Sequence, residues 1–237
     1  YASRGLGDVY KRQFVGSTGA GKTTIVNLLM RFYDVDGGKI LLDGQDIKSL
    51  SRDEVRRNFG MVLQDTWLFR GTIAENVSYG KPDATREEIE LACREAYCDH
   101  FIRTMPDGYD TLISEDTTNL SGGQKQRLCI ARALLRRPKI LILDDSTSAV
   151  DTKTDAKIRA GLASYLPNTT KLIIAQRISS VQDADRIIVM EGGRIAQIGN
   201  HDELLKTSEI YRETFTSQNK MSAEGEDAGE TAAADTL

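Results

Sequence analysis

The feature that most constrains this chain is a glycine-rich string at residues 16–23, Gly-Ser-Thr-Gly-Ala-Gly-Lys-Thr. The string fits the pattern G-x-x-x-x-G-K-[ST] and lies between the apolar pair Phe14-Val15 and a helical pattern from Lys22 to Arg31. Glycines allow the backbone to wrap closely around a phosphate, and a helix start offers N–H groups to it. This context predicts a nucleotide site. Its expected contact residues are Gly16, Ser17, Thr18, Gly19, Ala20, Gly21, Lys22, Thr23 and Thr24.

Short apolar runs alternate with helical patterns along the rest of the chain. Strand-like runs occur at residues 39–42, 60–63, 140–143, 172–175, 187–190 and 194–198. Helical patterns occupy residues 87–96, 99–104, 152–165 and a long stretch from Ser121 that ends before Pro138. Buried apolar strands that alternate with helices imply an α/β domain with a mainly parallel sheet. We predict a core at residues 14–64 and 138–218, with a helical subdomain inserted at about 65–137.

The composition excludes several classes of protein. The 237 residues include 31 Lys and Arg against 35 Asp and Glu, so the chain lacks the positive charge typical of nucleic-acid binding. Its longest apolar runs have the length of strands, far short of the ~20 residues of a membrane helix. Three scattered cysteines indicate a reduced, cytosolic protein, and with two histidines they offer no zinc-site spacing. We therefore expect no nucleic-acid partner, no metal-binding cysteines and no membrane span in this chain.

Both ends of the chain differ from its middle. Residues 219–237 hold Lys220 against five acidic side chains, which equals the net charge of −4 of the whole chain. We expect a disordered acidic tail there. Residues 1–13 show neither strand alternation nor helical periodicity, and residues 8–13 match the translation of a transposon-end sequencing adapter. We therefore expect residues 1–13 to be an adapter-derived segment foreign to the fold, with a natural variable N-terminus as the alternative, and the chain to be an N-terminally truncated fragment.

Two further motifs suit a phosphate-loop protein. The apolar run 140–143 ends at Asp144, and a carboxylate at the end of a buried strand can hold Mg²⁺ beside a bound phosphate. The string 120–124, Leu-Ser-Gly-Gly-Gln, starts a helix with Ser121 as the N-cap and Gln124 completing a capping box. An ordinary capped helix does not need two helix-weakening glycines. The string therefore indicates a second helix start that is open to an anion.

Together these motifs resemble the nucleotide-binding domain of ABC transporters, across nearly all of residues 14–218. The phosphate loop, Gln64, the LSGGQ signature, Asp144 and an Asp-loop at 148–151 occur in the family order. The segments 68–73 and 113–115 look like the exporter subfamily. The resemblance implies an α/β P-loop NTPase (RecA-like) core with an inserted α-helical ABC subdomain.

In this family two chains form a head-to-tail dimer, and each ATP lies between one chain's phosphate loop and the other chain's signature. The resemblance therefore implies ATP and Mg²⁺ as cofactors, an ATPase activity coupled to transport, and a place at the cytoplasmic face of the bacterial plasma membrane. It assigns the partner's ATP to Ser121, Gly122, Gly123 and Gln124, and Mg²⁺ to Thr23, Gln64 and Asp144. It assigns catalysis to Asp145, Gln176 and Gln64. The transmembrane domain would lie outside this chain.

Two positions depart from the family pattern. Asp145 stands where active members carry Glu, and Gln176 stands where they carry His. The shorter carboxylate falls short of the attacking water, and an amide carries no positive charge at any pH. Each change could cost ~10²–10³ in rate. We expect a degenerate site in this chain, whose intact signature completes the active site of a different half-transporter in a heterodimer.

Three questions stay open on the sequence alone. The chain either hydrolyses ATP to drive an exporter, or closes a dimer on ATP without hydrolysing it, or is a soluble ABC ATPase. The exporter-like segments disfavour the soluble ATPase. Trp67, Leu68 and Phe69 are candidates either for packing on membrane-domain helices or for the core. The cargo cannot be read, because substrate contacts in this family belong to the membrane domain.

Overall fold

The computed structural model describes residues 11–114, 118–144, 146, 149–174 and 184–217. The chain forms two compact units. Beyond the N-terminal residues, unit 1 runs from Val26 to Leu172, and unit 2 combines residues 10–25 with residues 173–237. Helix α1 (Lys22–Leu29) and strand β8 (Thr170–Ile174) each span a boundary between the two units.

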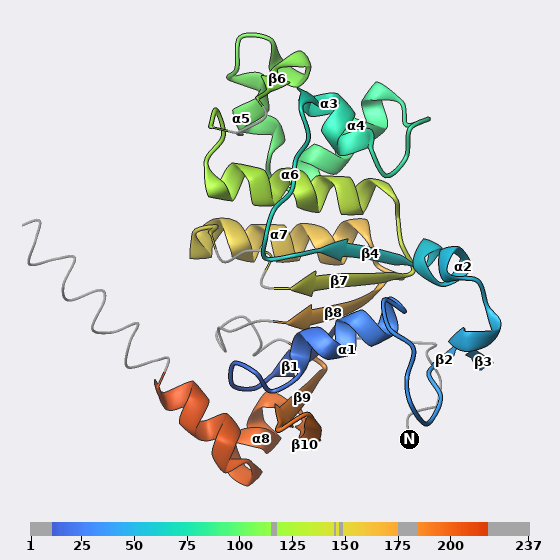
Figure 1. Ribbon diagram of the computed structural model, residues 1–237. Coiled ribbons are helices and arrows are strands. Elements are labelled where there is room, and N and C mark those ends of the chain that lie inside the picture. The colour runs from blue at the N-terminus through green and yellow to red at the C-terminus, as the bar shows by residue number, and fades with distance from the viewer. Residues whose placement is uncertain (1–10, 115–117, 145, 147–148, 175–183, 218–237) are drawn as a thin grey trace, which may run out of the picture. The chain divides into compact units, whose positions relative to one another are not determined.

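Unit 1 contains neighbouring parallel strands that end at one edge. β4 (Phe59–Val62) pairs in parallel with β7 (Ile140–Asp144), and Val62 lies opposite Leu143. β8 lies next to β7 in the same sheet. Leu141 and Ile142 in the middle of β7 are fully buried, which explains the uninterrupted apolar sequence of this strand. Because parallel strands end at the same edge of a sheet, the residues that follow β4 and β7 start next to each other (Figure 1).

Capping boxes fix where several helices of unit 1 begin. In α2 (Arg52–Arg57), α3 (Ile73–Ser78), α4 (Arg86–Glu95) and α6 (Gly122–Leu135), a Ser or Thr side chain accepts from the backbone N–H three residues later. The other α-helices of the unit are α5 (Asp99–Arg103) and α7 (Thr152–Tyr165). Figure 1 shows α3, α4 and α5 gathered on one side of α6. This group occupies the segment in which the sequence predicts a helical subdomain.

Short antiparallel strand pairs and 3₁₀ turns accompany these elements. β2 (Leu41–Leu42) pairs with β3 (Gln45–Asp46), and β5 (Gly71–Thr72) pairs with β6 (Leu112–Ile113). The 3₁₀ turns lie at residues 47–49 and 108–110. They are too short to carry a periodic pattern, and the sequence analysis does not predict them.

Buried thiols lie in the interior of the helical group. Cys93 and Cys98 are free and fully buried, and Cys98 Sγ donates to the Cys93 carbonyl at 3.3 Å. Burial raises the pKa of the Cys98 thiol well above its ordinary value. Beside them, the Tyr109 hydroxyl donates to Asp99 Oδ1 at 2.6 Å. Both cysteines are buried packing residues, and the described residues include no cluster that could hold a metal ion.

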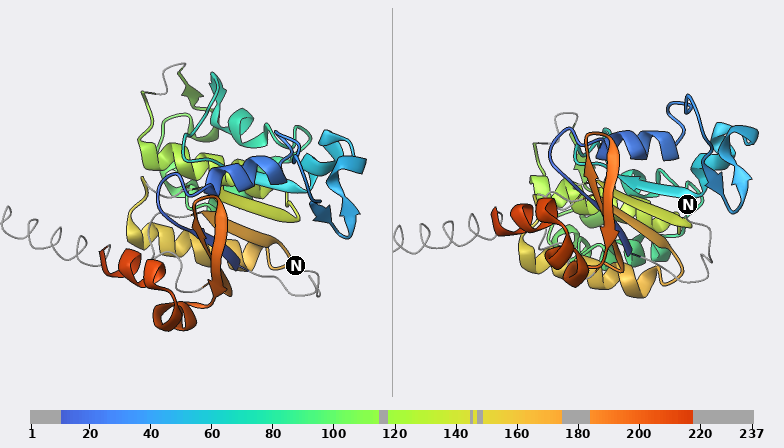
Figure 2. Two further views of the ribbon diagram at one scale, coloured as in Figure 1. Left: turned by 60° about the horizontal axis from the view of Figure 1, so that its bottom comes forward. Right: turned by 90° about the horizontal axis from the view of Figure 1, so that it is seen from below.

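Unit 2 is a smaller sheet with helices at its C-terminal end. β1 (Lys11–Val15) pairs in parallel with β9 (Arg186–Glu191), which turns through Gly192-Gly193 into antiparallel β10 (Arg194–Gly199) (Figure 2). Both glycines of this turn have positive φ, as a tight hairpin requires. α8 (His201–Thr207) and helical residues 209–217 follow. A buried apolar cluster is formed by Val15, Ala184, Ile187, Val189, Leu204 and Tyr211.

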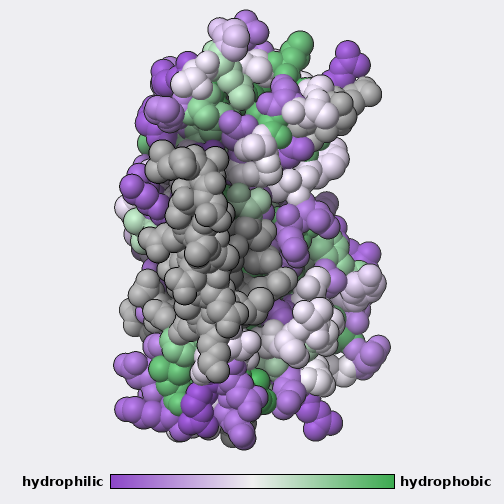
Figure 3. Space-filling view, turned by 90° about the vertical axis from the view of Figure 1, so that its left-hand side faces the viewer, coloured by the Kyte–Doolittle hydropathy of each residue, from purple (hydrophilic) through white to green (hydrophobic). Residues whose placement is uncertain are grey.

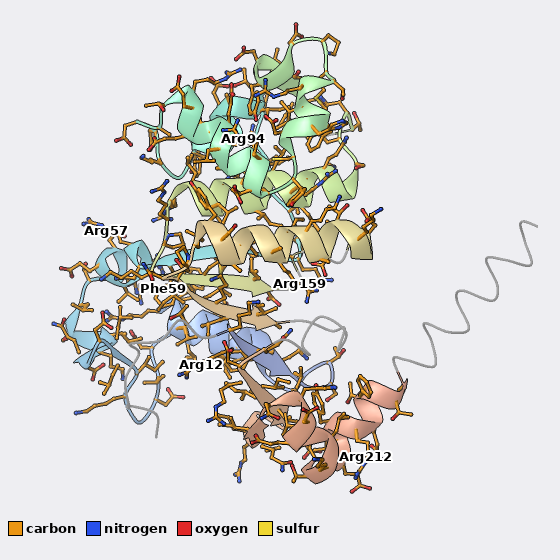
Figure 4. The ribbon with its side chains drawn as sticks, turned by 180° about the vertical axis from the view of Figure 1, so that it is seen from behind. Arg12, Arg57, Phe59, Arg94, Arg159 and Arg212 are labelled. Atoms are coloured by element: carbon orange, nitrogen blue, oxygen red, sulfur yellow. The ribbon has the colours of Figure 1, made fainter. Side chains whose placement is uncertain are left out.

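The structure confirms the predicted α/β class with mainly parallel strands, and it moves several boundaries. The sequence shows no strand signal before Phe14, yet β1 begins at Lys11, and Arg12 lies on this strand (Figure 4). Pairing with the backbone of β9, rather than a side-chain pattern, determines this start. The strand predicted at residues 39–42 contracts to β2. The strand-like runs predicted at residues 187–190 and 194–198 form the hairpin of β9 and β10.

Several predictions fall on residues that the structure does not describe. They concern residues 1–10, the acidic tail from residue 219, Asp145 and Gln176. On the face shown in Figure 3, the described surface is mainly hydrophilic with small hydrophobic patches. Among the described residues, the helices are too short or too polar to cross a membrane.

Candidate functional site

The phosphate-loop string lies between β1 and α1, the context that the motif requires. Val15 ends β1, and α1 begins at Lys22. The Lys22 ammonium donates to the carbonyl oxygens of Gly16 at 2.5 Å and Ser17 at 2.8 Å. The loop therefore wraps around the lysine head group and holds its positive charge within the turn.

Backbone geometry explains two of the glycines in this loop. Gly19 has a φ of +81°, which residues with a side chain rarely adopt, and a Cβ there would meet no atom within 4 Å. Gly16 passes so close to β9 that a Cβ would lie 2.4 Å from the Met190 carbonyl oxygen. The loop is also tied to the hairpin, since the Ala20 carbonyl accepts from the Gly193 N–H at 3.2 Å.

The groups that the loop presents suit a phosphate. The loop and the first turn of α1 also carry four exposed residues with hydroxyl groups, Ser17, Thr18, Thr23 and Thr24. The first turn of α1 adds backbone N–H groups at the positive end of its dipole. The string contains no carboxylate that would repel an anion. These residues fit the triphosphate of ATP, and the Thr23 hydroxyl is a hard oxygen ligand of the kind that Mg²⁺ prefers.

The other residues predicted for Mg²⁺ lie at one edge of the sheet in unit 1. Asp144 is the last residue of β7, and Gln64 follows the end of β4 by two residues. The register of Val62 opposite Leu143 places both at the same end of adjacent strands. Gln64 is exposed and Asp144 is half-buried. Their amide and carboxylate oxygens fit a hard divalent cation, while Thr23 belongs to unit 2.

The signature begins α6 as the sequence predicts. Ser121 Oγ accepts from the Gln124 N–H at 3.3 Å, and Gln124 Oε1 accepts from the Ser121 N–H at 2.8 Å. This reciprocal pair is the predicted capping box. Because the cap uses Ser121 Oγ as an acceptor, its hydroxyl hydrogen can still be donated to a phosphate oxygen.

The second signature glycine has a packing role that the sequence analysis missed. A Cβ on Gly123 would lie 2.9 Å from the Ala149 carbonyl oxygen, whereas a Cβ on Gly122 would reach the Ala149 side chain at an ordinary 3.5 Å. Neither residue has a positive φ. Gly123 is therefore required by close approach of the backbone at Ala149, in addition to any contact with a phosphate. The motif alone carries no signal for this contact.

An exposed aromatic cluster lies beside the Gln64 segment. Trp67, Phe69 and Tyr79 have ring centroids 5.3–6.3 Å apart, and Trp67 and Tyr79 are each 61 % exposed. Leu68 is buried, so it is a core residue rather than a contact for a membrane domain. The sequence analysis names Trp67, Leu68 and Phe69 but misses Tyr79, which only the fold brings next to them.

Arg132 of α6 holds this aromatic cluster in place. Its guanidinium donates to the carbonyls of Trp67 at 2.9 Å and Asn76 at 2.7 Å, and to Asn76 Oδ1 at 3.1 Å. It also lies over the rings of Trp67 and Tyr79. Burial lowers the pKa of Arg132. Because the ordinary pKa of an arginine is very high, the guanidinium stays charged. The sequence analysis misses this role, because the contacts join residues about 56 and 65 positions apart.

Comparison with known proteins identifies the family. Residues 8–148, more than half of the chain, match the ABC transporter family. The fatty acid ABC transporter ATP-binding/permease protein of Mycobacterium tuberculosis is 53 % identical over 197 residues, which are 83 % of this chain and 31 % of that protein. The ATP-dependent lipid A-core flippase of Thiobacillus denitrificans is 46 % identical over 205 residues, 86 % of this chain and 35 % of that protein.

A solved structure agrees with the sequence matches. The structure of a bacterial Atm1-family ABC exporter with ATP bound has a TM-score of 0.86 to this chain at 42 % identity. The match covers 89 % of this chain and 37 % of that one. The chain spans about a third of the length of the curated relatives it matches. It belongs to the ABC transporter family, as an ATP-binding domain of the exporter type with the P-loop NTPase fold.

Proposed function

We propose that this chain binds ATP and Mg²⁺ and couples ATP hydrolysis to export through a membrane domain at the cytoplasmic face of the bacterial plasma membrane. The observation that carries the proposal is Lys22 held within a complete phosphate loop. The relatives support the coupling, since the Mycobacterium tuberculosis relative is described as an ATP-binding/permease protein and the Thiobacillus denitrificans relative as a flippase. Bound Mg²⁺ would neutralise charge on the transferred phosphoryl group.

In this proposal each described group has one task. The Lys22 ammonium binds the β- and γ-phosphates, and Thr23, Gln64 and Asp144 supply oxygen atoms to Mg²⁺. Ser121 and Gly123 contact the γ-phosphate of the ATP that the partner's loop holds. The capping box supports this role, because it fixes the backbone of the first turn of α6 before any nucleotide arrives.

The proposal includes a degenerate site in this chain. Asp145 replaces the base that would orient the attacking water, and Gln176 replaces a cationic contact to the γ-phosphate. Both positions lie outside the described residues, so this part of the proposal is based on the sequence alone. The intact signature would then serve a second, different half-transporter whose own loop, Glu and His are complete. The alternative function is a non-hydrolysing module that closes the dimer when ATP binds.

Nucleotide binding by the 237-residue chain tests the first step. Lys22→Ala should weaken binding of Mg-ATP, measured by equilibrium dialysis, ~10- to 100-fold, because a charge-assisted contact to phosphate is lost. Lys39→Ala is the matched control, since Lys39 is exposed in unit 1. Equal affinity of the two variants would contradict the proposed site.

A gain of activity separates a silenced hydrolase from a binding module. Asp145→Glu combined with Gln176→His should raise the steady-state ATPase rate at least about tenfold if those two residues alone silence the site. An unchanged rate would mean that other residues disable hydrolysis and would favour the binding module. Full ATPase activity of a purified heterodimer after Ser121→Ala in this chain would contradict the assignment of the signature to the partner's site.

A further inference from the structure

The segment that leads into α7 is fastened to the signature helix at Ala149 by one buried side chain. Gln126 lies in the second turn of α6 and is 3 % exposed. Its Oε1 accepts from the Ala149 N–H at 3.0 Å. Ala149 itself is an exposed residue, and this bond fixes its backbone to a buried side chain of α6.

Two further contacts make this attachment specific. Gly123 passes the Ala149 carbonyl so closely that a Cβ would lie 2.9 Å from its oxygen. Val150, the next residue, is buried. The Ala149 backbone thus contacts α6 twice: its N–H donates to Gln126, and its carbonyl lies against Gly123.

The end of the attached segment at α7 is fixed as well. Asp151 caps α7, and its Oδ1 accepts from the Thr154 N–H at 2.8 Å. On α6, the residue after Gln126 holds the signature turn too. Arg127 Nε donates to the Gly123 carbonyl at 3.2 Å, and Arg127 Nη1 donates to the Tyr97 carbonyl at 2.7 Å. The first two turns of α6 and the loop at Ala149–Asp151 therefore form one connected body within unit 1.

We propose that Gln126 is a positioning residue that fixes the signature turn to the loop beginning at Ala149, so that the two move together. The inference rests on the proposed function for its consequence. Asp144, the Mg²⁺ residue of this chain's own site, lies five residues before Ala149, while Ser121 and Gly123 serve the partner's site. Gln126 thereby fixes the signature turn, which serves the partner's site, to a segment that follows Asp144 closely in the sequence.

Local hydrogen exchange in the 237-residue chain tests the attachment without nucleotide. Gln126→Met keeps the length of the side chain and removes the acceptor, and Gln126→Asn keeps an amide that is too short to reach. In both variants, exchange at the Ala149 N–H should rise about tenfold. Gln126→Glu keeps an acceptor oxygen and should restore the protection. Lys125→Met, one position earlier on α6, is the matched control.

Turnover tests the consequence for catalysis. In the Asp145→Glu, Gln176→His background, Gln126→Met should lower kcat about tenfold and change KM for ATP less than about twofold, because the phosphate loop is untouched. A merely structural role would lower the active fraction and would not be rescued by Gln126→Glu. Unchanged exchange at Ala149, or increased exchange with unchanged kcat, would overturn the inference. If the Asp145→Glu, Gln176→His background has no ATPase activity, that result contradicts the proposal of a silenced site instead. Exchange at Ala149 then decides whether Gln126 holds the loop.

Discussion

Each of the two glycine-rich motifs stands beside a buried glutamine, and the two glutamines differ in their hydrogen bonds. Gln13 lies on β1, three residues before the phosphate loop, and is fully buried. Gln126 lies on α6, two residues after the signature, and its Oε1 accepts a hydrogen bond from the Ala149 N–H. In contrast, neither Oε1 nor Nε2 of Gln13 has a hydrogen-bond partner among the described residues. A buried glutamine therefore positions the signature in one case, and in the other it only destabilises the strand that leads to the phosphate loop.

The apolar surroundings of Gln13 explain the difference. Gln13 lies opposite Ile187 in β9, and Val15, two residues further on the same face of β1, belongs to the cluster with Leu204 and Tyr211. A buried amide without partners costs about 1–3 kcal/mol. The unpaired amide lies within a strand that otherwise pairs regularly with β9 from Arg12 to Val15.

The largest effect should come from the tight contact at the signature. Gly123→Ala should lower the free energy of unfolding by about 3 kcal/mol, because the new Cβ meets the rigid Ala149 carbonyl. Gly122→Ala is the matched control and should change stability by less than about 1 kcal/mol, since its Cβ finds ordinary contact distance and alanine favours helix. Urea denaturation measures both. Equal effects would show that helix propensity, rather than contact with Ala149, explains the glycines.

A smaller effect of opposite sign should appear at β1. Gln13→Leu should raise the free energy of unfolding by about 1–2 kcal/mol, because an unpaired amide is replaced by an apolar group of similar volume. Gln45→Leu, at an exposed position in β3, is the control and should stay within about 0.5 kcal/mol of the parent chain. A loss of stability in Gln13→Leu would mean that the buried amide is satisfied in solution, and the contrast between the two glutamines would disappear.

Sequence reasoning reaches the parts of this site that are encoded locally. The phosphate loop, the capping box of Ser121 with Gln124, and the acid that ends β7 each lie within a few consecutive residues, so their spacing shows their role. The contacts of Gln126 with Ala149 and of Arg132 with Trp67 join residues 23 and 65 positions apart, and no local pattern predicts them. The unpaired burial of Gln13 is likewise a property of the sheet, because it depends on pairing with β9.

The smallest effect should appear at alkaline pH, and it tests whether the cluster on the Gln13 face excludes water. Tyr211 in that cluster is 1 % exposed, and burial raises its pKa to about 12. The folded state therefore holds the phenol proton above pH 10, where the unfolded chain releases it, so stability is full below pH 10 and falls as pH rises toward 12. The loss should reach about 1 kcal/mol at pH 11.

Tyr211→Phe separates this titration from every other alkaline group, because it removes the phenol and keeps the ring. The variant should lose the hydrogen bond between the hydroxyl and His201 Nδ1 at all pH values, but its stability should depend less on pH between 10 and 12 than that of the parent chain. Parallel curves for the two proteins would show that water reaches the phenol. Water in this cluster could also reach the Gln13 amide, so the same result would predict no gain in Gln13→Leu. A dry cluster requires both effects, and either one alone would contradict it.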